Sequence, residues 1–228
     1  HHLGFSIASE TQALLAIICA SGELATLAKE RIWQETQKAL SSQSPWIYFE
    51  VLEVCGALHQ LMPALAELLS RRPQALNTLR LTSAASTRTE VRFTGVLYQL
   101  NKPQIEDLAK QIKLPNQHKA LALATSNHQR QLRAYTELEA AQKHLLLSNL
   151  GLMRHTELLD DLLCLCQAIT QTQEPLFGWQ SPKQPILDDL ERIHAVKPTS
   201  LMAQGFKGMA LGEALKEAQI ACLSRSKT

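Results

Sequence analysis

Aromatic residues and glycine are scarce in this sequence. Only 5% of its 228 residues are aromatic, and only nine are glycine. So few glycines argue against an all-β fold, which needs many turns, and against a glycine-rich loop that binds nucleotide phosphates. The abundant residues are instead Leu, Ala, Gln, Glu and Lys, which lose little conformational entropy in a helix. The composition therefore favours an all-α fold.

Long hydrophobic runs and a signal peptide are also absent. No apolar run approaches the roughly 20 residues that span a bilayer, although 45% of the residues are hydrophobic and can form a packed core. The five cysteines are an odd number at irregular spacing, which is typical of a reduced intracellular protein. We expect a cytoplasmic protein that contacts no membrane.

Clusters of metal ligands are missing as well. The adjacent carboxylates Asp160-Asp161 and Asp188-Asp189 point to different helix faces, so surface charges or charges at a helix N-terminus are their expected roles. Five of the eight histidines are spread over separate predicted helices without the i,i+4 spacing of a ligand pair: His118, His128, His144, His155 and His194. The sequence predicts no metal site.

Helical periodicity runs through almost the whole sequence. Gly56 ends one predicted helix, and Pro63, Pro103 and Pro115 stand at or near the starts of others, where proline is tolerated. The polar, proline-rich segment 172–185 indicates a linker or a long loop. The helices are expected at about 10–21, 27–40, 45–55, 65–69, 74–86, 90–100, 104–113, 116–127, 130–148, 152–171, 186–195 and 208–223.

The stretch 30–63 carries the most specific pattern. Arg31, Glu35, Lys38 and Leu40 have the spacing Arg-x3-Glu-x2-Lys-x-Leu, in which the first two residues form an i,i+4 pair. This pattern resembles the neck motif of bacterial class II CCA-adding enzymes, the tRNA nucleotidyltransferases that build the 3′ CCA end. The resemblance implies that Arg31, Glu35 and Lys38 brace a neighbouring helix that carries the nucleotide-selecting residues.

Two further stretches agree with this resemblance. Residues 2–5 (HLGF) resemble the segment that follows the nucleotide-selecting helix of the family. Residues 205–208 (GFKG) resemble its tail motif Gly-x-Lys-Gly, although Met209 stands where the family has proline. A Gly-Lys-Gly turn at a helix N-terminus also suits a phosphate, because free N–H groups and the helix dipole favour an anion.

Residues 91–103 depart from the pattern of the family. Many class II enzymes carry a metal-dependent HD phosphohydrolase domain, with a His-Asp pair in a context similar to VRFAALxHDLGKG, whereas this chain has VRFTGVLYQLNKP. Tyr98 and Gln99 take the places of the His and the Asp, and neither supplies the imidazole or the carboxylate that such a metal pair needs. The resemblance therefore implies a degenerate HD-like helical body without a metal.

The elements of nucleotidyl transfer are not found in the sequence. It contains no Asp-x-Asp, no Gly-Gly or Gly-Ser loop and no strand platform, which a two-metal carboxylate site needs. In the family these elements precede the segment with which this chain begins. We therefore predict no catalytic residue and no cofactor in this chain. The resemblance implies that Mg²⁺ belongs to the full enzyme and that the missing N-terminal head is a partner.

RNA binding is expected to depend on phosphate contacts by Lys and Arg. The net charge of +2 is too small to indicate a nucleic-acid partner by itself. The spacing of Lys110, Lys113 and Lys119 is compatible with one side of a helical hairpin. The candidate RNA-binding residues are Arg71, Arg72, Arg88, Lys102, Lys110, Lys119, Arg130, Arg133, Lys207 and Lys216.

Together these patterns predict an elongated all-α protein with neck helices at 1–69, a degenerate HD-like body at 70–172 and a tail at 173–228. The expected function is tRNA docking, as the C-terminal part of a CCA-adding enzyme whose head adds C, C and A from CTP and ATP and is absent from this chain. Two alternatives remain. The first is a headless paralogue that binds structured RNA without catalysis, and the second is an all-α scaffold or interaction protein.

Overall fold

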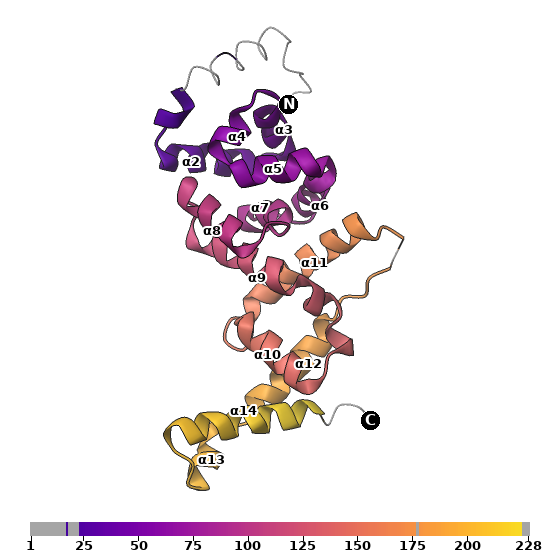
Figure 1. Ribbon diagram of the computed structural model, residues 1–228. Coiled ribbons are helices and arrows are strands. Elements are labelled where there is room, and N and C mark those ends of the chain that lie inside the picture. The colour runs from indigo at the N-terminus through magenta and orange to yellow at the C-terminus, as the bar shows by residue number, and fades with distance from the viewer. Residues whose placement is uncertain (1–16, 18–22, 177, 225–228) are drawn as a thin grey trace. The chain divides into compact units, whose positions relative to one another are not determined.

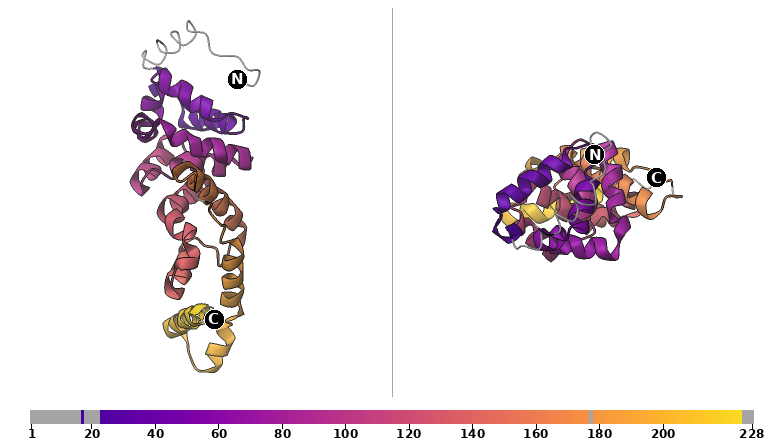
Figure 2. Two further views of the ribbon diagram at one scale, coloured as in Figure 1. Left: turned by 90° about the vertical axis from the view of Figure 1, so that its right-hand side faces the viewer. Right: turned by 90° about the horizontal axis from the view of Figure 1, so that it is seen from above.

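The structure of the chain is helical, as the composition predicts. It is a computed structural model that describes residue 17, residues 23–176 and residues 178–224. Helices form most of this part of the chain, and no strand occurs in it (Figures 1 and 2). The all-α fold class is confirmed. Residues 2–5 and the helix predicted at about 10–21 lie outside the described residues, except for Ile17.

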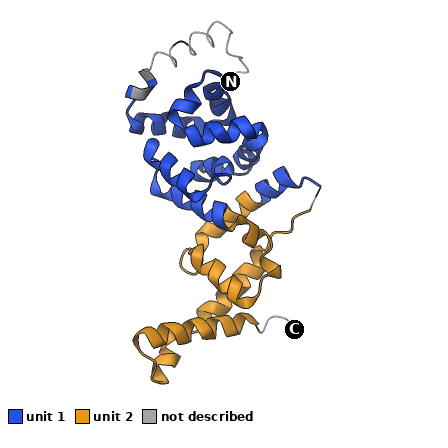
Figure 3. Cartoon of the chain, in the orientation of Figure 1, with its two compact units in different colours: residues 1–127, 167–177 blue, residues 128–166, 178–228 orange. Residues whose placement is uncertain are grey.

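The chain divides into two compact units (Figure 3). Unit 1 comprises residues 1–127 and 167–177, and unit 2 comprises residues 128–166 and 178–228. Helices α9 (Asn116–Arg133) and α11 (Leu159–Gln173) each contribute residues to both units. The division into neck, body and tail follows from the family resemblance, and it stays a prediction.

Unit 1 is built from short helices joined by tight turns. Its elements are α2 (Lys29–Leu40), α3 (Trp46–Val54), α4 (Ala57–Leu61), α5 (Pro63–Arg71), α6 (Leu76–Ala85), α7 (Thr89–Leu97) and α8 (Lys102–Gln111), with 3-10 turns at Glu23–Thr26 and Pro73–Ala75. Gly56 adopts a left-handed φ of 75° and ends α3, as predicted. Pro63 begins α5, also as predicted. The side chains and backbone N–H groups of Asn101 and Gln104 exchange two hydrogen bonds of 3.0 Å, a capping box that begins α8.

Aromatic rings join α2, α3 and α7 in the core of unit 1. The rings of Phe49 and Phe93 stack with their centroids 5.9 Å apart, and the ring of Trp33 lies 6.2 Å from that of Phe93. Burying a side chain of this size contributes about 1.5–3 kcal/mol. Helices α6 and α7 approach each other closely at Gly95, where an added Cβ would lie 2.5 Å from Oγ1 of Thr82. Close packing therefore explains the glycine at this position.

A buried arginine ties several chain segments together in unit 1. Arg92 of α7 is only 7% exposed, and burial lowers its pKa. Its Nη1 donates to the carbonyls of Leu40 and Ser42 at 2.7 and 2.9 Å. Its Nε and Nη2 donate to the carbonyls of Ser86 and Ser83 at 2.6 and 3.2 Å. These carbonyls lie at or just beyond the C-terminal ends of α2 and α6, where the helix dipole favours a cation.

Unit 2 departs from the predicted helix boundaries. The prediction of a single helix at about 130–148 is wrong, because α9 continues to Arg133 and a 3-10 turn (Tyr135–Glu137) separates it from α10 (Ala140–Asn149). The predicted start at about 152 is also wrong, because a 3-10 turn (Thr156–Leu158) precedes α11. The other helices of this unit are α10 (Ala140–Asn149), α12 (Lys183–Ala195), α13 (Pro198–Ala203) and α14 (Gly208–Ser224).

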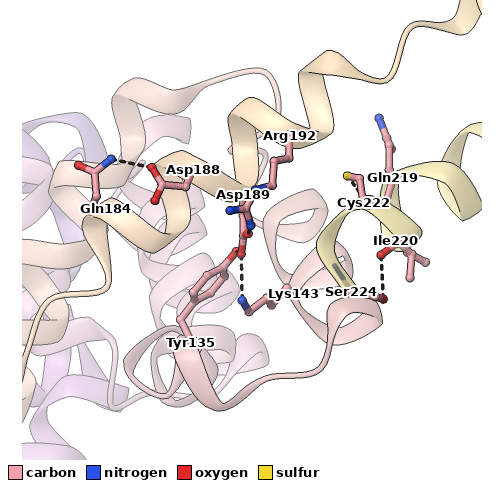
Figure 4. A network of polar contacts seen from close by, with 10 residues as sticks. All are labelled: Tyr135, Lys143, Gln184, Asp188, Asp189, Arg192, Gln219, Ile220, Cys222 and Ser224. Atoms are coloured by element: carbon pink, nitrogen blue, oxygen red, sulfur yellow. Dashed lines mark hydrogen bonds and ion pairs between the residues drawn. The ribbon is translucent and has the colours of Figure 1, made fainter. Parts of the chain in front are cut away.

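A buried carboxylate organises unit 2 (Figure 4). Asp189 of α12 is 2% exposed, and its Oδ2 accepts hydrogen bonds from the Tyr135 hydroxyl at 2.9 Å and from Nζ of Lys143 at 3.0 Å. Nη1 of Arg192 donates to the other oxygen at 3.2 Å. Burial, together with the neighbouring Asp189 carboxylate, raises the pKa of Tyr135. The expected surface or helix-N-terminal role is therefore wrong for Asp189, whereas its neighbour Asp188 is half-exposed.

Candidate nucleic-acid interface

A surface depression lies at the hairpin between α8 and α9 in unit 1. Its volume is about 390 Å³, and three lysines line it. Lys110 belongs to α8, Lys113 to the turn and Lys119 to the first part of α9. Their spacing therefore does bring these lysines to one side of the hairpin. The other lining residues are Glu106, Ala109, Leu114 and Asn116.

The turn between the two helices positions these lysines. The N–H of Leu114 donates to the carbonyl of Ala109 at 3.0 Å, which closes the C-terminal end of α8 as a Schellman motif. Lys113 adopts a φ of 53°, in the left-handed region that favours glycine. The side chain of Leu114 is buried and anchors the turn. Pro115 then precedes α9, in agreement with the prediction.

The lysines of the depression are only weakly neutralised. Nζ of Lys113 lies 2.6 Å from Oε1 of Glu30, which belongs to α2, and Nζ of Lys110 lies 3.4 Å from Oδ1 of Asp107. The side chains of both pairs are largely exposed, so water and salt screen these contacts strongly. Within the described part of the chain, Lys119 forms no ion pair. The hydrogen bond from Lys113 lowers the pKa of Glu30.

The other predicted RNA-binding residues are spread over both units. Arg133 is half-buried, and its backbone carbonyl accepts a hydrogen bond of 3.2 Å from the indole of Trp179. The exposed ones are Arg71, Arg72, Arg88, Lys102, Arg130, Lys207 and Lys216. Three of these pair with glutamates, namely Arg71 with Glu67, Arg88 with Glu90 and Lys102 with Glu106. Their contact with RNA stays a prediction.

Three of the four residues of the neck motif lie on the exposed face of α2, whereas the fourth, Leu40, is buried. Arg31, Glu35 and Lys38 are all exposed, and among the described residues the ion pair of this helix is made by Glu30 instead. The residues through which α2 packs against the rest of unit 1 lie on its opposite face and include Trp33, which is buried. An exposed face is available to a neighbouring helix, so the bracing role stays a prediction.

Polar and aromatic contacts attach the face of α2 that contains Trp33 to the rest of unit 1. Oγ1 of Thr36 lies 3.1 Å from the Tyr48 hydroxyl of α3, and burial raises the pKa of Tyr48. The Trp33 ring packs edge-on against the His118 ring, with the centroids 4.7 Å apart. His118 is 1% exposed, and its Nε2 lies 3.1 Å from Oγ1 of Thr89. Burial lowers the pKa of His118.

The tail motif forms the turn between α13 and α14. Gly205 and Gly208 have φ angles of 94° and 57°, which only glycine adopts readily. Lys207 and Phe206 between them are exposed, and Gly208 begins α14. The local geometry therefore matches the Gly-x-Lys-Gly pattern, and phosphate binding at this turn stays a prediction.

The positions of the HD metal pair have structural roles in this chain. Tyr98 is buried at the C-terminal end of α7. Gln99 is half-buried, and its Nε2 donates to the carbonyl of Ala75 at 3.4 Å. A phenol and a carboxamide do not replace an imidazole and a carboxylate as ligands of a hydrolytic metal. These residues therefore do not fit the metal of an HD domain.

The fold and this surface define a class of protein: an all-helical module with a lysine-lined depression. Across the described ranges, no group of three or more His, Cys, Asp or Glu side chains is arranged to hold a metal ion. Among the same residues, no helix is both long enough and apolar enough to cross a membrane.

Comparisons with known proteins agree with the neck motif. Residues 4–69 match a family model described as the probable RNA and SrmB-binding site of polymerase A. The chain is 33% identical to the multifunctional CCA protein of Teredinibacter turnerae, over 100% of this chain and 63% of that protein. It is 31% identical to that of Hahella chejuensis, over 99% of this chain and 61% of that protein. No solved structure matches the chain.

Over its whole length the chain therefore resembles the C-terminal portion of the CCA-adding enzymes. It spans less than two thirds of the length of the curated relatives that it matches. The resemblance predicted from the neck motif is thus confirmed.

The structural roles of some important residues were not predicted from the sequence. Arg92 and Asp189 have partners more than 45 residues away in the sequence, such as the carbonyl of Leu40 and the hydroxyl of Tyr135. No short motif marks such contacts. Glu30 was also missed, although it directly precedes the neck motif, because its partner Lys113 lies on a different helical hairpin.

Proposed function

We propose that this chain is the tRNA-docking part of a CCA-adding tRNA nucleotidyltransferase. The observation that carries this proposal is the similarity of the entire chain to multifunctional CCA proteins. The family model at residues 4–69, whose description names RNA, supports the same function for the first part of the chain. In the cell we expect this protein in the cytoplasm, with tRNA as its partner.

The proposed contacts are electrostatic and use the RNA backbone. Exposed Lys and Arg side chains neutralise phosphates and release counterions, which gives affinity without reading base sequence. The depression at the α8–α9 hairpin brings together two exposed lysines, Lys110 and Lys113, and the half-buried Lys119. Its lining includes no aromatic residue, so stacking on single-stranded bases is not the proposed mode of contact. A folded tRNA is recognised by the shape of its backbone.

The proposed chemistry lies outside these residues. Addition of C, C and A from CTP and ATP requires a head with carboxylates that hold Mg²⁺ ions. We assign no catalytic residue to this chain. Its role is to hold the tRNA body while the 3′ end reacts elsewhere in the enzyme, and this docking contributes through orientation of the substrate.

A titration of the chain with fluorescent tRNA, followed by anisotropy, tests the proposal. Measurements at about 50 mM and about 200 mM salt give the slope of log affinity against log salt. Three phosphate contacts give a slope near −2.7, which weakens binding roughly fortyfold between these conditions. A single-stranded RNA of equal length serves as the comparator, and tRNA is expected to bind more tightly because its folded shape is recognised.

The outcome separates docking from the alternatives. Salt-dependent binding with a preference for tRNA supports the proposal. No binding, or binding that does not respond to salt, favours an all-α scaffold with no nucleic-acid role. Equal binding of tRNA and unstructured RNA contradicts recognition of tRNA shape.

A further inference from the structure

One ion pair connects the lysine-lined depression to the helix that carries the neck motif. Glu30 stands in the first turn of α2, directly before Arg31, and its Oε1 lies 2.6 Å from Nζ of Lys113. The Glu30 and Lys113 side chains are 58% and 60% exposed. Water and salt weaken a contact of this kind, so another anion is able to compete for Lys113.

We infer that the depression binds RNA backbone phosphates and that the Glu30 carboxylate competes with RNA for Lys113. This inference rests on the proposed function and assigns RNA docking to a particular place in the fold. The carboxylate of Glu30 takes one of the positions that a phosphate oxygen takes in the complex. RNA binding therefore exchanges a contact within the protein for a contact with the substrate.

The lining of the depression suits a phosphodiester chain. Its side chains carry three positive charges and one negative charge, that of Glu106. Lys102, from outside the depression, lies 3.9 Å from the Glu106 carboxylate and partly neutralises it. The volume of about 390 Å³ is larger than one phosphate needs, so it accommodates a short piece of backbone. Flexible ammonium groups bind phosphates as point charges and do not require one fixed geometry.

The backbone at Lys113 makes it possible to test binding separately from folding. This residue has a φ of 53°, a backbone angle that is strained for a residue with a Cβ and unstrained for glycine. A lysine at this position therefore lowers the stability of the turn compared with glycine. The substitution Lys113→Gly is expected to raise the urea midpoint of the protein and, at the same time, to weaken RNA binding. A purely structural role for Lys113 does not predict this combination.

The exposed pair Lys183 and Asp160 in unit 2 supplies matched controls. Its N–O distance is 2.7 Å, and neither residue lines the depression. Lys183→Gln removes one positive charge, as Lys119→Gln does. Asp160→Asn removes one negative charge and frees a lysine, as Glu30→Gln does. The controls thus report the effect of net charge alone.

The experiment measures tRNA affinity by anisotropy across a salt series for each full-length variant. Lys113→Gly and Lys119→Gln are each expected to weaken binding about fivefold and to make the salt slope shallower by about 0.9. Glu30→Gln is expected to tighten binding by a few fold, because it removes the competitor of the phosphate. The two control variants are expected to change affinity by less than twofold. Urea unfolding of every variant checks the fold.

Each result has a distinct meaning. If the wild-type chain shows no salt-dependent tRNA binding, the proposed function is overturned, and the inference goes with it. If the wild-type chain binds tRNA and the Lys113, Lys119 and Glu30 variants behave as the controls do, the proposed function is supported. In that case the assignment of RNA binding to the depression is overturned. If poly-glutamate displaces tRNA as effectively per charge as poly-uridylate does, the depression is a general anion site, and its assignment to RNA is overturned.

Discussion

The two units of this protein use buried charge in opposite ways. In unit 1 a buried cation, Arg92, donates to four backbone carbonyls. In unit 2 a buried anion, Asp189, accepts from three side chains, those of Tyr135, Lys143 and Arg192. The first arrangement ties helix ends together, and the second ties helix faces together. In both units the buried charges hold the helices, so the exposed lysines remain available to a partner.

The largest effect is expected from removing the cation of unit 1. Arg92→Leu removes the donor of one buried and three part-buried carbonyls, and a loss of about 4 kcal/mol in the free energy of unfolding is expected. Urea denaturation followed by circular dichroism measures it. Arg92→Lys is expected to recover part of the loss, because one ammonium group cannot reach all four carbonyls. A loss below about 1 kcal/mol for Arg92→Leu would refute its organising role.

Removing the buried anion of unit 2 is expected to lower the free energy of unfolding somewhat less than removing Arg92 does. Asp189→Leu leaves the hydroxyl of Tyr135 and the ammonium of Lys143 without their acceptor, and a destabilisation of about 3 kcal/mol is expected. Hydrogen exchange measured by mass spectrometry is expected to show faster exchange of the backbone amides of α10 and α12. As a control, Asp188→Leu affects the half-exposed neighbour and is expected to cost less than about 1 kcal/mol. Equal losses of stability for Asp189→Leu and Asp188→Leu would show that the buried carboxylate stabilises unit 2 no more than its half-exposed neighbour does.

A smaller, pH-dependent effect is expected from His118 in unit 1. Burial lowers the pKa of this imidazole below its usual value of 6.5, so the unfolded chain binds a proton more readily than the folded chain. Stability is therefore lost as the pH falls from about 7 towards about 5. In His118→Gln the stability of unit 1 is expected to depend less on pH over this range. The Glu90 carboxylate, which faces this group, opposes the shift and titrates at lower pH. An unchanged dependence of stability on pH in His118→Gln would exclude His118 as the source of this pH effect.

The smallest effect is expected from the neck motif. Arg31→Gln and Glu35→Gln replace exposed side chains of α2 and are each expected to change the free energy of unfolding by less than about 0.5 kcal/mol. Thermal unfolding of this chain measures both. A loss above about 1 kcal/mol for either variant would show that the motif stabilises unit 1 itself and does not serve a neighbouring helix.

Local signals predicted much of the fold and part of the site. Gly56 and Pro63 fix helix ends through their own backbone preferences, so their roles are visible in sequence. The spacing of Lys110, Lys113 and Lys119 placed them together because a short hairpin connects them. The break after Arg133 was not predicted, since the turn contains neither glycine nor proline. It places Tyr135 so that its hydroxyl reaches the distant Asp189, and such a tertiary contact leaves no local signal.

The site of RNA contact is the central claim, and lysine footprinting tests it most directly. The chain is treated with a lysine-acetylating reagent in the presence and absence of tRNA, and mass spectrometry measures the modification of each lysine. We predict that tRNA protects Lys110, Lys113 and Lys119 together and leaves Lys183 as reactive as before. Unchanged acetylation of all three lysines under conditions where tRNA is bound would contradict this account.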